Sequence, residues 1–134
     1  MKKPKSEHSY YRELPRYNIL HLKPKVKFPS IENHDFFVKD VSLAGIQIYS
    51  KMRITLNSFH LVEFSLANQK CRLNINQVWI EENFKRDNEM EERIKFLSSE
   101  IIYRSGFRLK FHDYQDFKVW TKINQALHNH FSEK

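Results

Sequence analysis

Short runs of alternating apolar and polar residues constrain the fold of this chain more than any other feature of its sequence. They occupy residues 17–28, 34–39, 45–50, 59–66, 71–80 and 101–111. Alternation with a period of two gives a strand one buried face and one polar face. The alternation that begins at Cys71 changes phase at Val78, and Gly106 inside the last run predicts a bulge or a close approach of another backbone. We therefore predict a mainly β protein, a small antiparallel β-barrel of about six strands.

The C-terminal stretch has a different periodicity. Apolar positions recur there at spacings of three and four residues: Phe117, Trp120, Ile123 or Asn124, Leu127 and Phe131. This stripe predicts an amphipathic α-helix at about residues 114–131. Asp113 can cap the start of the helix, and Asp116 lies in the first turn, where negative charge is favourable. We expect the helix to pack across a barrel mouth or a sheet face.

Charge is distributed unevenly along the chain. Residues 1–28 contain eight Lys or Arg and two Glu, a net charge of +6, whereas the whole chain carries +7. Residues 1–17 also lack sustained apolar periodicity, so we predict a mobile basic leader there and a single domain over residues 18–134. Such a leader favours binding to an anion. Residues 81–100 are highly charged, and we predict a long excursion between two strands, with a short helix at 89–97 as the alternative.

The composition excludes several classes of protein. No apolar run approaches the roughly 18 residues of a transmembrane helix, and no secretory apolar region follows the basic N-terminus. Cys71 is the only cysteine, so an internal disulfide is impossible and a cytoplasmic location is favoured. The seven histidines lack the spacing of a zinc site, and no glycine-rich phosphate loop, nucleophile elbow or catalytic carboxylate pair occurs. We expect no enzymatic activity, no metal and no cofactor.

Two short motifs carry polar chemistry. Arg12 and Arg16 form an R-x-x-x-R pair in the leader. Asp40, Ser42 and Gly45 form a D-x-S-x-x-G turn between two predicted strands. The turn offers a carboxylate acceptor, a hydroxyl group and a backbone that is free to bend at the glycine. Each motif is a weak signal alone, but together they combine two cations with a polar turn.

This pair of motifs resembles that of the PilZ domain, a bacterial receptor module for cyclic di-GMP. The resemblance includes the 23 residues between the motifs, a glycine-containing strand at 103–109 and a C-terminal helix. It implies a non-enzymatic receptor that binds cyclic di-GMP through Arg12, Arg16, Asp40, Ser42 and Gly45. The arginines would pair with phosphates and guanines, and the Asp40 carboxylate would accept from guanine N1–H and N2–H. Tyr11, just before Arg12, is a further candidate that would stack on a base.

The resemblance also implies how a signal would be passed on. Binding would order residues 1–17, which would then present a new surface to a downstream protein of motility, pilus, exopolysaccharide or transcription machinery. One monomer or one intercalated dimer of the ligand both fit the motifs.

Two alternatives stay open. A basic β-barrel with 14% aromatic residues could bind single-stranded nucleic acid, although this is less favoured, or the chain could be a protein-interaction module. Nucleic-acid binding would tolerate any base and weaken steeply with salt, whereas the receptor would prefer cyclic di-GMP.

Overall fold

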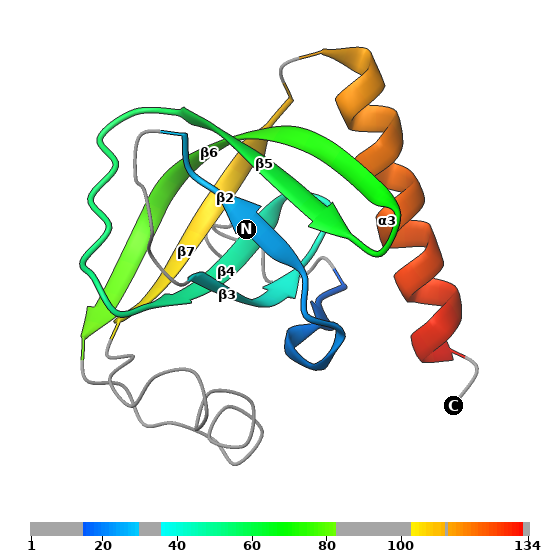
Figure 1. Cartoon of the computed structure of the whole chain (residues 1–134), viewed down its shortest axis with the longest axis horizontal. Coiled ribbons are helices and arrows are strands. Elements are labelled where there is room, and N and C mark those ends of the chain that lie inside the picture. Colours follow the sequence, from blue (N-terminus) through cyan, green and yellow to red (C-terminus); the bar gives the residue numbers. More distant parts are fainter. Residues whose placement is uncertain (1–14, 30–35, 83–102, 112, 133–134) are drawn as a thin grey trace, which may run out of the picture.

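The computed structural model describes residues 15–29, 36–82, 103–111 and 113–132. One antiparallel sheet and one long helix account for most of them (Figure 1). The predictions for Tyr11, Arg12, the rest of the leader up to residue 14 and the helix at 89–97 lie outside the described residues. Within the described ranges, no helix is long and apolar enough to cross a membrane.

Seven strands form the sheet. They are β1 (Tyr17–Asn18), β2 (Lys25–Lys27), β3 (Phe36–Val41), β4 (Gly45–Ser50), β5 (His60–Leu66), β6 (Gln69–Glu82) and β7 (Tyr103–Lys110). Their order across the sheet is β1-β3-β4-β7-β6-β5-β2, with every neighbouring pair antiparallel. The sequence predicted one strand over residues 17–28, but a 3-10 turn, η1 (Leu20–Leu22), separates β1 from β2. Tyr17, at the end of the predicted leader, belongs to β1 and pairs with Val41.

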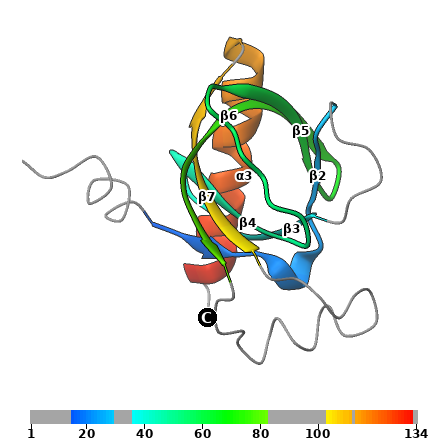
Figure 2. The same ribbon diagram turned by 90° about the vertical axis from the view of Figure 1, so that its left-hand side faces the viewer.

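The sheet curls into a half-barrel. Its edge strand β2 comes to lie beside β3 across a seam that has no ladder pairing between the two strands (Figure 2). Pro24 precedes β2, and lysines flank the buried Val26, as suits an edge strand. The prediction of a mainly β, barrel-like sheet followed by a C-terminal helix is confirmed.

The core fills the inside of this curl. Apolar side chains from every long strand are buried there, among them Val38, Ile46, Ile48, Val62, Leu73 and Phe107. Helix α3 (Tyr114–Ser132) lies across one end of the half-barrel (Figure 2) and adds Trp120, Ile123 and Leu127 to the same cluster. The Trp120 ring meets the Phe64 ring edge to face, with 5.1 Å between the centroids. The helix therefore closes one mouth of the half-barrel.

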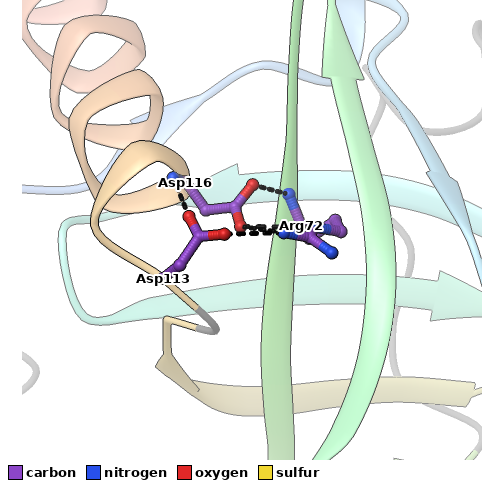
Figure 3. Close-up of polar contacts among 3 residues, drawn as sticks. All are labelled: Arg72, Asp113 and Asp116. Atoms are coloured by element: carbon purple, nitrogen blue, oxygen red, sulfur yellow. Dashed lines mark hydrogen bonds and ion pairs between the residues drawn. The ribbon is translucent and has the colours of Figure 1, made fainter.

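Three polar side chains fix the start of α3 (Figure 3). The Asp113 carboxylate accepts the backbone N–H of Asp116 at 3.0 Å, which is the predicted cap. Arg72 of β6 donates through Nη2 to Asp113 at 2.7 Å, and its backbone N–H donates to Asp116 at 2.8 Å. The backbone hydrogen bond from Asp116 is the main reason why the pKa of Asp113 lies below its ordinary value. This cluster ties the helix to the sheet.

A bulge in β3 changes which side chains face outward. Val38 pairs with Ile48, but Asp40 pairs with Gln47, so Lys39 is an extra residue in the ladder. In a regular ladder Lys39 would oppose Gln47, and Asp40 would face the core. The bulge therefore places the Asp40 side chain on the outer face of the sheet.

A second bulge in β6 has the same effect on Trp79. Gln77 pairs with Phe107 and Trp79 pairs with Gly106, so Val78 is the extra residue. The change of phase seen in the sequence at Val78 corresponds to this bulge. Without it, Trp79 would point towards the core.

Candidate ligand-binding site

The two bulges align a row of residues across four neighbouring strands. In order across the sheet, the row contains Asp40 of β3, Gln47 of β4, Gly106 of β7 and Trp79 of β6. Gln47 lies between Ile46 and Ile48, whose side chains are in the core, so Gln47 faces the opposite side. The row therefore lies on the outer face of the half-barrel.

The surface around this row is hollowed. The hollow, called the Asp40 hollow below, is lined by Arg16, Asp40, Ser42, Gly45, Gln47 and Trp79 and by part of β7. Its volume is about 30 Å³, room for one or two water molecules, so a dinucleotide would lie across it and not inside it. The fold thus brings the second arginine of R-x-x-x-R to all three fixed residues of D-x-S-x-x-G.

The turn covers only part of the D-x-S-x-x-G motif. Asp40 and Val41 belong to β3, and the turn runs from Ser42 to Gly45. Ser42 donates its backbone N–H to the Gly45 carbonyl oxygen at 2.9 Å, and Gly45 donates its N–H to Ser42 Oγ at 3.1 Å. Gly45 does not have a positive φ, so its freedom to bend is not what the turn uses. A Cβ there would lie 3.1 Å from the Phe107 carbonyl oxygen, and this close approach favours glycine.

Asp40 combines burial with nearby positive charge. Asp40 is 8% exposed. Its Oδ1 lies 3.9 Å from Arg16 Nη1, and its Oδ2 lies 3.9 Å from Lys39 Nζ. Burial raises the pKa of Asp40 and outweighs the opposite effects of Lys39, Arg16 and Arg104. The carboxylate therefore has lost much of its water, and its ion pairs within the described residues are long. Such a group is suited to accept hydrogen bonds from a ligand.

Trp79 and Gly106 were not among the site residues that the sequence predicted. The indole lies against Gly106, where a Cβ would overlap Nε1 and Cε2 and come within 2.8 Å of Cζ2. The predicted close approach at Gly106 is therefore made by a side chain and not by backbone. The Arg104 guanidinium lies 5.4 Å from the Trp79 ring centroid and forms an ion pair with Glu81. Only the break in alternation at Val78 hinted that Trp79 faces outward.

Arg108 adds further positive charge to the hollow. It is part of the lining, and its guanidinium lies 5.9 Å from the centroid of the Phe59 ring, over which Lys110 Nζ also lies at 4.7 Å. Arg16 and Arg108 both line the hollow, and Arg16 is the one of the two that contacts Asp40. This arrangement favours an anionic ligand that also has hydrogen-bond donors.

Comparisons of the chain with protein-family models, with curated proteins and with solved structures return no match. The resemblance to PilZ domains therefore rests on the sequence motifs alone.

Proposed function

We propose that this protein is a non-enzymatic receptor that binds cyclic di-GMP at the Asp40 hollow. The proposal is carried by one observation. Arg16 and the D-x-S-x-x-G residues Asp40, Ser42 and Gly45, far apart in the sequence, line the same hollow on the outer face of the sheet. These are the residues that the resemblance to PilZ domains assigns to the ligand.

The chemistry of the hollow supports this ligand. The Arg16 side chain is 36% exposed, so its guanidinium can turn towards a phosphate or a guanine. The buried Asp40 carboxylate can accept from the N1–H and N2–H groups of guanine. The Trp79 indole offers a flat surface on which a base can stack. The ligand would lie across the hollow and place one base edge against Asp40.

The proposal includes a response in the leader. Residues 1–28 carry a net charge of +6, and the ligand brings two phosphates to Arg12 and Arg16. Neutralising this charge would favour one arrangement of residues 1–17, and a downstream protein would recognise that arrangement. Hydrogen exchange of the amides between Ser6 and Arg16, with and without cyclic di-GMP, tests the response. Equal protection in both states would place the response elsewhere.

Calorimetric titration with cyclic di-GMP tests the binding itself. Arg16→Ala and Arg12→Ala should each lower the affinity at least tenfold, because losing a hydrogen bond to a charged group costs about 1.5–3 kcal/mol. Arg53→Ala is the matched control. Arg53 is 54% exposed, contacts Glu82 and does not line the hollow, so its removal should leave the affinity unchanged.

Two results would contradict the proposal. One is an Arg16→Ala variant that binds cyclic di-GMP as well as the wild type does. The other is a wild type that ignores cyclic di-GMP yet binds oligonucleotides of any sequence with a steep dependence on salt, as expected of a nucleic-acid-binding barrel.

A further inference from the structure

Gln47 occupies the second position of the outward row and lacks a partner for one of its polar atoms. The residue is 8% exposed and lies between Asp40 and Gly106 in the ladder. Its side-chain carbonyl oxygen, Oε1, is shielded from solvent and has no hydrogen-bond partner within the described part of the chain. Buried polar atoms are paired in the large majority of cases, so an unpaired one requires a physical explanation.

A second glutamine in the same sheet shows the ordinary arrangement. Gln77 Nε2 donates to the Ile54 carbonyl oxygen at 2.7 Å and approaches Ser105 Oγ at 3.2 Å. Its Oε1 accepts the backbone N–H of Leu56 at 3.2 Å. Gln77 is thus satisfied within the sheet, whereas Gln47, whose Oε1 is unpaired, lies in the lining of the Asp40 hollow.

We infer that Gln47 is a specificity-determining residue whose carbonyl oxygen accepts a hydrogen bond from the base of the bound ligand. This inference rests on the proposed function. Asp40 and Gln47 are register partners on adjacent strands, so the row presents two acceptors side by side. On the guanine edge, N1–H and one N2–H pair with the Asp40 carboxylate, and the second hydrogen of the N2 amino group is left for Gln47 Oε1. The adenine edge places an acceptor, N1, beside its N6 donor, so one of the two protein acceptors would face another acceptor.

Arg16 lies beside Asp40 in the lining of the hollow, where its movement would change access to the carboxylate. Oε1 is shielded from solvent, so a donor reaches it only after the lining side chains separate. The Arg16 guanidinium is held to Asp40 by a 3.9 Å contact and is partly exposed, so it can swing outward at little cost. A phosphate that draws Arg16 away would release the Asp40 carboxylate for the base. The same movement would join recognition of phosphate to recognition of guanine.

Gln47→Leu tests the inference, because leucine is of similar size to glutamine but lacks both polar atoms. We expect its affinity for cyclic di-GMP to fall about five- to tenfold, from the loss of one hydrogen bond to a desolvated acceptor. The affinity for cyclic di-AMP should stay unchanged, so the ratio of the affinities for cyclic di-GMP and cyclic di-AMP falls. The ligand-free variant should be at least as stable as the wild type in urea, since Gln47 Oε1 has no hydrogen bond to lose among the described residues.

Gln77→Leu is the matched control and should show the opposite pattern, with lower stability and unchanged affinity of the folded fraction. Wild-type affinity for cyclic di-GMP in Gln47→Leu would overturn the inference and leave the proposed function intact. A Gln47→Leu variant that unfolds would overturn it as well, because the oxygen would then have a structural role. If the wild type does not bind cyclic di-GMP while Arg53→Ala and the wild type remain folded, the proposed function itself fails.

Discussion

Asp40 is the residue at which burial and electrostatic attraction act most directly against each other. Burial raises the pKa of its carboxyl group above the ordinary 3.8, although Lys39, Arg16 and Arg104 all lower it. A raised pKa in the folded state means that the folded protein prefers the protonated form. The contribution of Asp40 to stability is therefore fully present below pH 3.8 and is lost as the pH rises through the raised pKa. The ionised carboxylate is kept at neutral pH at the expense of stability.

Asp40→Asn removes this conflict. We expect the variant to be slightly more stable than the wild type at neutral pH, with the difference disappearing as the pH falls towards 3.8. It should also bind cyclic di-GMP more weakly, because an amide offers only one acceptor. Urea unfolding across this pH range measures the first effect. Glu63→Gln, at an exposed position of β5, is the control and should show no such gain. A variant that is less stable at every pH would show that Asp40 has a structural role.

At the scale of elements, α3 connects the core to the site. The Trp120 side chain is fully buried, and its indole N–H donates to the carbonyl oxygen of Leu43 at 3.2 Å. Leu43 lies in the Ser42–Gly45 turn, so the helix that closes the half-barrel also holds the turn that lines the Asp40 hollow. The anchoring of α3 by Arg72 therefore supports the position of the turn.

Trp120→Phe should weaken this connection. Phenylalanine keeps a ring near Phe64 but leaves a cavity and an unpaired carbonyl group, which together lower the free energy of unfolding by about 1–3 kcal/mol. Denaturant unfolding measures the loss. Phe117→Leu, at a half-exposed position of the same helix, should change it by less than about 0.5 kcal/mol. Equal effects of the two substitutions would contradict the role given to Trp120.

Most of the elements could be predicted from periodicity, because the signal for a strand or a helix is local. β4 begins and ends where the alternation does, and α3 starts one residue after the capping Asp113. The alternation over residues 17–28 did not show that β1 is a separate strand, because β1 is defined by its pairing with β3 and by the contacts of Tyr17 with α3. The bulge at Lys39 also escaped prediction, because an extra residue is defined by the partner strand.

At the scale of the whole molecule, the same distinction applies to the site. Asp40, Ser42 and Gly45 were recognisable because they lie within six residues of one another in the sequence. Gln47 and Trp79 join them through the register of four strands, of which the sequence showed only the break in alternation at Val78. A site that is assembled across a sheet is thus partly visible in the sequence, at the positions where it coincides with a turn.

Cys71 offers a probe of the stability of the whole fold. The residue is 5% exposed, and burial, with a smaller effect from Asp116, raises the pKa of its thiol to about 12. A thiol reagent needs an accessible thiolate, so it should react with the native protein at least about a thousandfold more slowly than with the unfolded chain. The rate should rise in Trp120→Phe. Ser58→Cys, an exposed position, is the fast control, and an equally fast native Cys71 would contradict the prediction.

The two tryptophans of the chain lie in opposite environments. Trp79 is partly exposed beside the Asp40 hollow, whereas Trp120 is enclosed between the sheet and the helix. The emission maximum of an indole moves to longer wavelength on contact with water, and a base stacked on the indole quenches its fluorescence. A fall in fluorescence intensity without a shift of the emission maximum would report ligand bound at the hollow. A shift of the emission maximum to longer wavelength would report exposure of Trp120 on unfolding. The intrinsic fluorescence of the protein therefore reports ligand binding through Trp79 and unfolding through Trp120. In Trp79→Phe only the signal of Trp120 remains.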